Sequence, residues 1–296
     1  MKVMLIGSTG QLGWELVRTC PDSVGSDSFE LAVLGSSQID LCSRQSIHRC
    51  IRDTSPDCII NAAAYTAVDK AEQEIEAAYQ LNHQAVLELA TQAEKNKIQL
   101  VHISTDFVFN GQNFKPYTPD DPPCPDSVYG KSKLEGERAV AQIMGNKALI
   151  IRTAWLYSAH GHNFVKTLLN LMQEKESLTV IDEQIGSPTW AFGLAKAIWI
   201  SIEKELIGIF HWTDAGVASW YDFAVAIQEE GLAAGLLSRA IPIFPVSTSE
   251  YPTPAKRPMY GVLDKRSMWQ ATGITPVHWR VQLRAMLKEV SLKELN

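Results

Sequence analysis

The chain has 296 residues, of which 46% are hydrophobic, and this composition excludes a disordered protein and leaves room for one large domain or two modest ones. Its 27 basic and 33 acidic residues give a net charge of −6, which provides no electrostatic basis for binding nucleic acid or an anionic membrane. No apolar run approaches the roughly 20 residues of a membrane-spanning helix, and the apolar stretch at residues 3–6 is too short for a signal peptide.

Cysteine usage predicts a reducing, cytoplasmic environment. The cysteines are odd in number, scattered and without a C-x-x-C pair, which favours neither a disulfide framework nor a zinc site. They are Cys20, Cys42, Cys50, Cys58 and Cys124. The histidines of "HGH" at 160–162 stand alone, and we interpret them as part of a polar loop rather than as metal ligands.

The first half of the chain alternates between apolar runs and helical patterns. The runs lack the alternation of a half-exposed strand, so they suit strands buried on both faces of a parallel sheet. The expected strands lie at 2–7, 30–35, 57–64, 99–105 and 148–155. The expected helices lie at 11–20, 43–53 with Ser43 as N-cap, 71–96 as two helices or one bent helix, and 129–144. This order predicts an α/β fold, a Rossmann-like doubly wound parallel sheet over residues 1–155.

The pattern loosens after residue 155. Helices are expected at 161–176 and 189–205, and the second of these should pack back on the first domain. Residues 208–230 predict a strand, a loop and a helix capped by Ser219, and residues 241–264 are rich in proline and irregular. We therefore expect residues 156–296 to form a smaller, loop-rich domain that supplies the substrate side of a cleft.

The segment "GSTGQLG" follows the first expected strand and opens the first expected helix. It places Gly7, Gly10 and Gly13 where glycine permits a tight turn and a close approach of the backbone to phosphate. The helix N-terminus then offers free N–H groups and a positive dipole end to a diphosphate. Residues 1–155 are therefore predicted to bind NAD(P).

The end of the second strand bears on the choice between NADPH and NADH. A carboxylate there would bind the adenosine ribose and repel a 2′-phosphate, but the chain has Gly35. This leaves NADPH possible and weakens the demand for NADH. Asp40 lies slightly later and suits either an adenosine contact or a helix-capping role, and both readings remain open.

Small and polar residues follow the third and fourth strands. The alanines at 62–64 leave room for a flat cofactor along the strand ends. Ser104 and Thr105 place hydroxyls at the carboxyl end of a strand, where α/β sheets bind ligands, and Asp106 is adjacent. Such a hydroxyl can hydrogen-bond a carbonyl oxygen that gains negative charge.

Tyr129 precedes Lys133 by four residues, a spacing that places both side chains on one helix face. A cation near a phenol favours the phenolate and lowers its pKa from about 10, giving a proton donor near neutral pH. Alone, the pair also suits the surface of an amphipathic helix. Together with the glycine-rich loop and Thr105, it favours a reactive site.

The combined motifs resemble the extended short-chain dehydrogenase/reductase family, and the resemblance is closer to the dTDP-4-dehydrorhamnose reductase family. It covers nearly the whole chain in the same order, through "GSTGQLGWEL", "NAAAYTAVDKAE", "STDFVFNG", "YGKSKLEGE", "RTAWLYS", "HNFVKTLL", "IDEQIGSPTW" and "YPTPAKRP". The resemblance implies reduction of the 4-keto group of dTDP-4-dehydro-β-L-rhamnose to dTDP-β-L-rhamnose, the last step in making that sugar donor. It also implies NADPH or NADH as cofactor and a small nucleotide-sugar as substrate.

The resemblance also implies roles for single residues. Tyr129 matches the proton donor to the C4 oxygen, Lys133 the residue that binds the nicotinamide ribose and lowers the pKa of the tyrosine, and Thr105 the hydroxyl that holds the sugar carbonyl. The further cofactor contacts implied are Gly10, Gln11, Leu12, Asp40, Leu41, Ala64, Tyr65, Thr66 and Ile103. The substrate contacts implied are Asp106 and Trp155, although Trp155 also suits a core aromatic. Arg257 is a candidate for the diphosphate of the substrate, or else a solvated loop arginine.

Two departures from the family pattern matter. Gly35 replaces a frequent acidic residue, which favours NADPH and leaves NADH possible. Some members of the family form dimers around magnesium with acidic residues at three places; Glu15 matches one, but Phe192 at the second cannot bind a metal. We therefore predict no metal, and a monomer or homodimer.

Three alternatives remain open at this stage. The chain could be a related nucleotide-sugar epimerase or dehydratase, because Asp106 beside the hydroxyl also suits that chemistry. It could be a regulatory subunit like that of methionine adenosyltransferase, which resembles the same family, although intact Thr105, Tyr129 and Lys133 argue against it. It could also be a redox sensor that binds NADPH without turning over a sugar nucleotide.

Overall fold

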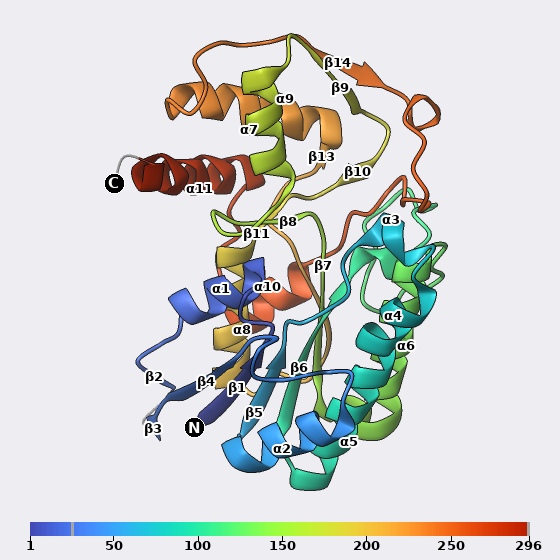
Figure 1. Cartoon of the computed structure of the whole chain (residues 1–296), viewed down its shortest axis with the longest axis vertical. Coiled ribbons are helices and arrows are strands. Elements are labelled where there is room, and N and C mark those ends of the chain that lie inside the picture. The colour runs from blue at the N-terminus through green and yellow to red at the C-terminus, as the bar shows by residue number, and fades with distance from the viewer. Residues whose placement is uncertain (25–26, 295–296) are drawn as a thin grey trace.

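A parallel sheet lies at the centre of the computed structural model, which describes residues 1–24 and 27–294 (Figure 1). Its six strands follow the order β12-β7-β6-β5-β1-β4 and every neighbouring pair is parallel. The bounds are β1 Lys2–Ile6, β4 Glu30–Leu34, β5 Cys58–Asn61, β6 Gln99–Thr105, β7 Leu149–Thr153 and β12 Gly208–Trp212. The predicted α/β, Rossmann-like fold is confirmed. The strand order reverses between β1 and β5, which is where sheets of this kind bind ligands.

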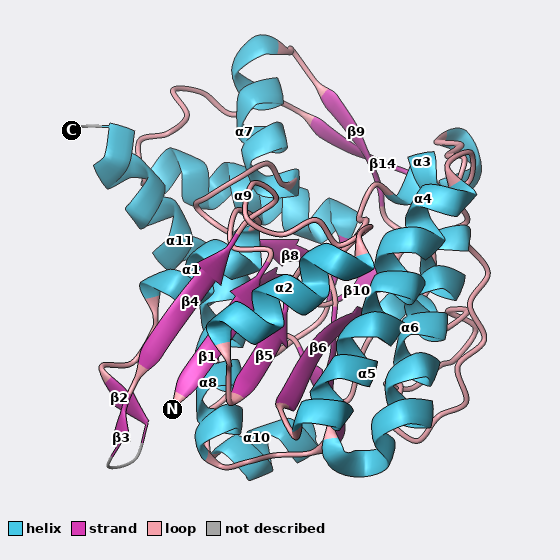
Figure 2. Ribbon diagram, turned by 60° about the horizontal axis from the view of Figure 1, so that its bottom comes forward, coloured by secondary structure: helices cyan, strands magenta, loops and turns pink. Residues whose placement is uncertain are grey.

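Helices cover both faces of the sheet, which explains why its strands are apolar throughout (Figure 2). One face packs against α2 (Arg44–Thr54), α5 (Ala85–Asn96) and α6 (Val128–Met144). The other face packs against α1 (Gln11–Arg18), α8 (Ala191–Glu203) and α10 (Arg266–Thr272). The result is a three-layer arrangement with an apolar core on each side of the sheet.

Helix α1 begins at Gln11 and α2 begins directly after its N-cap Ser43, as the sequence predicts. The side chain of Ser43 caps α2, and that of Ser127 caps α6 by accepting from the backbone N–H of Gly130. The predicted helix at 71–96 is α4 (Ile75–Tyr79), a π-helical turn at 80–84 and α5. Gly136 of α6 lies against that π turn, where a Cβ would come within 2.2 Å of the Asn82 carbonyl oxygen. The short helix α3 (Val68–Ala71) precedes α4.

The second half of the chain forms its own apolar cluster above the sheet in Figure 1. Its helices are α7 (Phe164–Glu174), α9 (Trp220–Ala233) and α11 (Trp279–Glu294). Ser219 caps α9 in a capping box with Asp222, as predicted for Ser219. The short strands pair as β8 (Leu156–Tyr157) with β11 (Thr189–Trp190), β10 (Ile185–Gly186) with β13 (Ala218–Ser219), and β9 (Leu178–Ile181) with β14 (Ile243–Val246).

The sheet does not end with residue 155. The strand at 208–212, which the sequence suggested for the second domain, pairs with β7 as the sixth strand, so that part of the expectation is wrong. The edge of β7 would otherwise be an unpaired row of backbone groups, which β12 covers. Helices α8 and α10 also return to the sheet. A boundary at residue 155 that separates cofactor from substrate functions stays a prediction.

A buried ion pair ties β7 to α6. Arg152 of β7 donates to both carboxylate oxygens of Glu137 at 2.9 and 2.7 Å, and both side chains are nearly inaccessible. The guanidinium also lies 5.1 Å from the ring centre of Phe109. Burial, together with this neighbouring cation, lowers the pKa of His211 on β12 to about 3, so the imidazole is neutral.

All five cysteines are free thiols. Within residues 1–24 and 27–294, no helix combines the length and the apolar character that crossing a membrane requires.

Candidate active site

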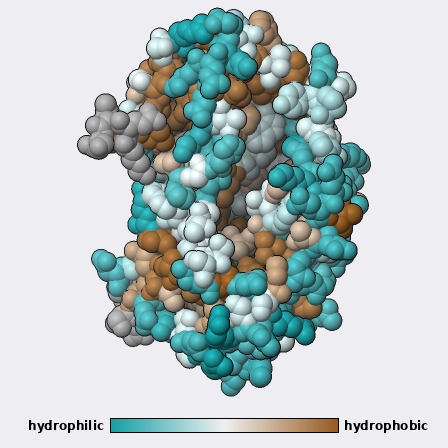
Figure 3. Space-filling model, viewed as in Figure 1, coloured by the Kyte–Doolittle hydropathy of each residue, from teal (hydrophilic) through white to brown (hydrophobic). Residues whose placement is uncertain are grey.

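A cavity of about 960 Å³ opens at the carboxyl ends of the sheet strands, between the sheet and the second half of the chain (Figure 3 shows the hollow). It brings together most of the residues that the sequence singles out. Those in its lining are Gly7, Gly10, Gln11, Leu12, Asp40, Leu41, Ala64, Thr66, Ile103, Thr105, Asp106, Tyr129, Lys133 and Trp155. Gly13, Tyr65 and Arg257 are not in the lining.

The glycine-rich loop between β1 and α1 has a conformation that only glycine accommodates. Gly7 has φ +87°, and a Cβ there would lie 2.6 Å from the backbone nitrogen of Ala63. A Cβ on Gly13 would lie 2.1 Å from the carbonyl oxygen of Gly7, so Gly13 acts from behind the loop rather than in the cavity. Gly10 is the N-cap of α1 and leaves the first turn of that helix directed to the cavity. This arrangement suits a diphosphate.

The adenosine end of the cavity contains Gly35 and Asp40. A Cβ on Gly35 would lie 3.2 Å from the methyl group of Thr9 and 3.4 Å from the hydroxyl of Ser8, so position 35 faces the glycine-rich loop. Asp40 lines the cavity and also accepts a hydrogen bond from the backbone N–H of Cys42 at 2.9 Å. Ser43 rather than Asp40 caps α2, so the helix-capping reading of Asp40 is wrong, and its adenosine contact stays a prediction.

The reactive groups come from β6 and the start of α6. Tyr129 and Lys133 lie one helical turn apart, and both are buried at the edge of the cavity. The Lys133 ammonium donates to the carbonyl oxygen of Ile103 at 2.6 Å. The Thr105 hydroxyl donates to Asp106 at 3.0 Å, and its contact with Tyr129 favours the phenolate. A hydroxyl, a phenol and an ammonium therefore line the same cavity.

The pKa of Tyr129 differs from the expectation. Burial raises it to about 12, outweighing the hydrogen bond between Tyr129 and Thr105, and the negative charge of Asp106 adds to the rise. Burial also lowers the pKa of Lys133 to about 8. The prediction that Lys133 lowers the pKa of Tyr129 is therefore wrong for the protein alone, because the helical spacing says nothing about the desolvation of the two groups.

Asp106 is a buried carboxyl in the same wall. Burial raises its pKa to about 7, although the Thr105 hydroxyl opposes the rise. Close to neutral pH, a large fraction of Asp106 is therefore protonated and can donate a hydrogen bond.

Trp155 closes the cavity from the side of the second half. Its backbone has φ +48°, a left-handed conformation that is strained for a bulky residue. The indole stacks on Trp220, with ring centres 3.5 Å apart and an interplanar angle of 8°. A Cβ on Gly186 would come within 2.5 Å of the Trp155 ring, so this glycine leaves the indole its space.

Two predicted residues outside the cavity lining have partners of their own. Arg257 forms a two-pronged ion pair with Asp69 of α3, at 2.9 and 2.7 Å. The hydroxyl of Tyr65 donates to Glu74 at 2.6 Å. The structure thus gives Arg257 a defined partner rather than a solvated position.

Among the residues around the cavity that were not predicted from the sequence, four shape the side that faces the second half of the chain. Gly161 and His162 line it from the loop after β8, and Trp220 and Gly186 set the position of Trp155. A glycine within a strand signals close approach of another group, which applies to Gly186. Helical or strand periodicity offered no signal for the other three.

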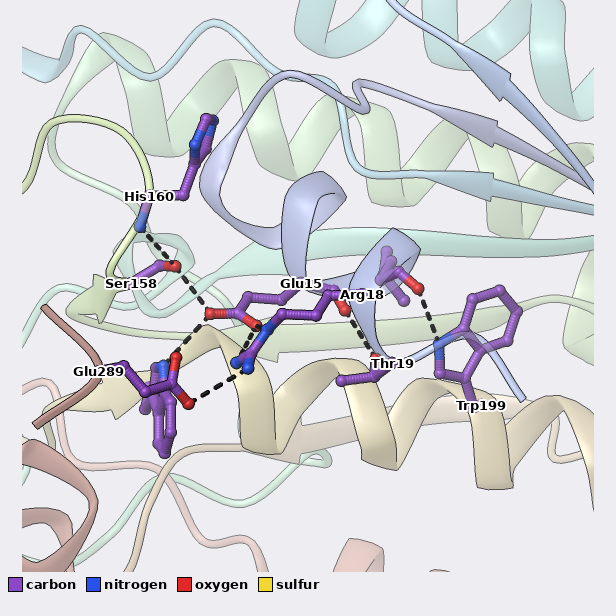
Figure 4. Close-up of polar contacts among 9 residues, drawn as sticks. Glu15, Arg18, Thr19, Ser158, His160, Trp199 and Glu289 are labelled. Carbon is purple, nitrogen blue, oxygen red and sulfur yellow. Dashed lines mark hydrogen bonds and ion pairs between the residues drawn. The ribbon is translucent and has the colours of Figure 1, made fainter. Parts of the chain in front are cut away.

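Glu15, considered above as a metal ligand, is fully buried and serves the fold (Figure 4). Its oxygens accept from the Ser158 hydroxyl at 2.8 Å and from Arg18 at 2.6 Å. The Arg18 guanidinium lies 4.7 Å from the ring centre of Phe192 and also pairs with Glu289 at 3.1 Å. No group of three His, Cys, Asp or Glu side chains suited to a metal occurs in the described part of the chain.

The sequence and the fold of this chain are similar to those of several known proteins. The family described as "RmlD substrate binding domain" matches residues 1–292. The spore coat polysaccharide biosynthesis protein SpsK of Bacillus subtilis strain 168 is 40% identical over 98% of both chains. The dTDP-4-dehydrorhamnose reductase of Aggregatibacter actinomycetemcomitans is 37% identical over 96% of this chain and 97% of its own. The structure of dTDP-4-dehydrorhamnose reductase from Bacillus anthracis strain Ames in complex with NADP has a TM-score of 0.88 at 32% identity, covering 97% of this chain and 99% of that one.

Proposed function

The chain belongs to the dTDP-4-dehydrorhamnose reductase family, and from this premise we propose that it uses NADPH to reduce the 4-keto group of dTDP-4-dehydro-β-L-rhamnose to dTDP-β-L-rhamnose. The observation that carries the proposal is the single cavity whose wall contains the glycine-rich loop, Thr105, Tyr129 and Lys133. A cofactor site and a proton donor therefore face the same space.

The residues present fit NADPH. The glycine-rich loop offers the first turn of α1 to the diphosphate, and the small alanines at 62–64 line the cavity beside it. Gly35 leaves the adenosine end without a carboxylate that would repel a 2′-phosphate. Ile103 and Lys133 line the same cavity further along and would hold the nicotinamide ribose.

When bound, NADPH supplies the hydride that adds to C4 of the sugar. Tyr129 holds its proton firmly in the protein alone, because burial raises its pKa to about 12. It gives up that proton to the C4 oxygen as negative charge develops there. Thr105 stabilises the same oxygen through a hydrogen bond, and the ammonium of Lys133 stabilises the tyrosinate that remains.

The substrate side of the site is also a proposal. Asp106 and Trp155 line the cavity next to Thr105 and would contact the sugar. Arg257 pairs with Asp69, which follows the lining residue Val68, and we assign Arg257 to the diphosphate of the substrate, for which it must leave or share that ion pair.

The alternatives have weaker support. An epimerase or dehydratase, a regulatory subunit and a redox sensor each remain compatible with parts of the site, but relatives at 37% identity over nearly the full length are named as reductases. We further propose that the enzyme works in the cytoplasm as a monomer or homodimer, without nucleic acid or a membrane, as its free thiols and net charge of −6 suggest.

The direct test follows NADPH oxidation by absorbance. The substrate, dTDP-4-dehydro-β-L-rhamnose, is generated in the cuvette from dTDP-glucose by the upstream enzymes, and NADH is compared in parallel. We expect oxidation that depends on the sugar nucleotide. Binding of NADPH without oxidation would contradict the proposed substrate.

Replacing Gly35 with aspartate should shift the cofactor preference from NADPH towards NADH. A carboxylate at this position hydrogen-bonds the ribose hydroxyl of NADH and repels the 2′-phosphate of NADPH. We expect the ratio of kcat/KM for NADPH to that for NADH to fall by about tenfold or more, or about 1.4 kcal/mol. Gly35→Asn has the same shape without the charge, so an equal fall in that variant would show that crowding against Thr9 and Gln38 is the cause.

Replacing Gly186 with alanine should impair the substrate site and spare the cofactor site. The added methyl group would lie 2.5 Å from the Trp155 ring, so the ring must shift from its place in the cavity wall. We expect KM for the sugar nucleotide to rise about tenfold, while the Kd for NADPH stays unchanged. Gly193→Ala on α8, where the nearest atoms lie at 3.4 Å, is the control. An unchanged KM in Gly186→Ala would show that Trp155 does not contact the substrate.

A further inference from the structure

A short loop of the second half lies against the glycine-rich loop of the first. We call residues 158–163, between β8 and α7, the clamp loop. Two of its residues, Gly161 and His162, line the same cavity as Gly10 and Gln11. Figure 4 shows Ser158 and His160 of this loop beside α1 and Glu15. The cavity wall next to the expected diphosphate site is therefore built from both halves of the chain.

His160 contacts the glycine-rich loop directly. Its Nε2 lies 3.1 Å from the carbonyl oxygen of Thr9, and it must donate because a carbonyl oxygen only accepts. The imidazole also stacks on Trp14 of α1, with ring centres 5.3 Å apart and an interplanar angle of 6°. The Thr9 carbonyl and the Gly10 N–H share one planar peptide group. Holding that carbonyl therefore fixes the peptide plane that leads into the N-cap of α1.

Asn163 holds the first residue of α1. Its Nδ2 donates to the side-chain oxygen of Gln11 at 3.0 Å and to the carbonyl oxygen of Ser158 at 2.7 Å. Its Oδ1 accepts from the backbone N–H of Lys166 and so caps α7. One side-chain amide thus joins the two ends of the clamp loop and links the loop to the start of α7 and to the start of α1.

A buried carboxylate anchors the beginning of the clamp loop. The Ser158 hydroxyl donates to Glu15 at 2.8 Å and accepts from the backbone N–H of His160 at 3.1 Å (Figure 4). Glu15 is fully buried on the inner face of α1, and Arg18 balances its charge. At Gly161, φ +74° turns the chain between the two contacts, and a Cβ there would lie 3.3 Å from the Gln11 side chain.

We propose that the clamp loop is the contribution of the second half of the chain to the cofactor site, in which His160 and Asn163 are positioning residues that hold the glycine-rich loop ready for the dinucleotide diphosphate. The proposal rests on the proposed function for the identity of the dinucleotide. A loop that is ordered before its ligand arrives loses less conformational entropy on binding, so the clamp lowers the Kd for the cofactor.

The test compares two variants that each remove one side-chain donor of the clamp loop. His160→Phe retains an aromatic ring for the Trp14 stack but cannot donate to Thr9. Asn163→Asp retains the oxygen that caps α7 but cannot donate to Gln11 or to the carbonyl oxygen of Ser158. We expect each to raise the Kd for NADPH, measured by titration calorimetry, by about tenfold. At saturating NADPH, kcat and the KM for the sugar nucleotide should stay within about twofold of the wild-type values.

Thr167→Val is the matched control. The Thr167 hydroxyl donates to the carbonyl oxygen of Asn163 at 2.9 Å, so its loss disturbs the same junction without touching the glycine-rich loop. Its Kd for NADPH should equal that of the wild type. In a Gln11→Ala background, Asn163→Asp should raise the Kd by less than it does in the wild type, because only the hydrogen bond to Ser158 remains to be lost.

Several results would overturn the proposal. They are an unchanged Kd in both donor variants, an equal loss in Thr167→Val, and a rise in the KM of the sugar nucleotide as large as the rise in the Kd for NADPH. The calorimetry does not depend on turnover. If the wild type binds NADPH but reduces no sugar nucleotide, the proposed substrate fails and the comparison of Kd values still decides the role of the clamp loop. A wild type that fails to bind NADPH would refute both.

Discussion

Tyr129→Phe should lower kcat by about 10²- to 10⁴-fold, with the KM for the sugar nucleotide changed by less than about threefold. The variant loses the one hydroxyl hydrogen that the site delivers to the C4 oxygen, while the ring keeps its edge-to-face contact with Phe107. Binding of the sugar and of NADPH involves the rest of the cavity, so those constants should change little. A loss of turnover, measured by absorbance, together with an unchanged Kd for NADPH, measured by calorimetry, would identify Tyr129 as the proton donor.

Tyr79→Phe provides the matched control for this result. Tyr79 lies on α4, which packs against α6, and it is outside the cavity lining, so loss of its hydroxyl should leave kcat within about twofold of the wild type. If Tyr129→Phe itself keeps kcat within about tenfold of the wild type, another group delivers the proton. Asp106, with a pKa of about 7, would then be the first candidate.

Arg152→Met should destabilise the protein strongly, lowering the free energy of unfolding by about 3–5 kcal/mol. The substitution leaves Glu137 as a buried carboxylate without its two guanidinium hydrogen bonds at 2.9 and 2.7 Å. A buried charge without a partner carries a large desolvation cost. Urea unfolding monitored by circular dichroism measures the change.

Two further variants identify the cause of that loss. The double variant Glu137→Leu/Arg152→Met removes both charges and should recover most of the stability. Arg138→Met on the same helix breaks an exposed pair with Glu135 and should cost less than about 1 kcal/mol. If the double variant is no more stable than Arg152→Met alone, the packing of Arg152 against Phe109, rather than the unpaired charge, accounts for the effect.

The parts of the site that the sequence predicted depend on local geometry. The glycine-rich loop and the Tyr129–Lys133 pair each lie within one turn or one helix, so spacing alone indicates which groups share a face. The order of strands and helices likewise predicted the parallel sheet. Local signals of this kind do not depend on which distant segment packs alongside.

The features that the sequence did not reveal depend on distant contacts or on burial. Asn163 meets Gln11 across 152 residues, and Arg257 meets Asp69 across 188. Neither pair shares a motif that would connect them. The pKa of Tyr129 was predicted in the wrong direction because burial, which spacing does not report, outweighs the hydrogen bond between Tyr129 and Thr105. The family resemblance supplied residue roles, but it did not indicate that Trp220 and Gly186 hold Trp155.

The position of β12 has a consequence for the synthesis of the protein. His211 of β12 pairs in register with Arg152 of β7, although the whole of α7 and α8 lies between these two residues in the chain. When β7 has left the ribosome and β12 has not, the sheet therefore has an open edge at β7. Until Trp212 has emerged, that edge can pair with strands of other chains. The growing chain is therefore open to aggregation at this stage of synthesis.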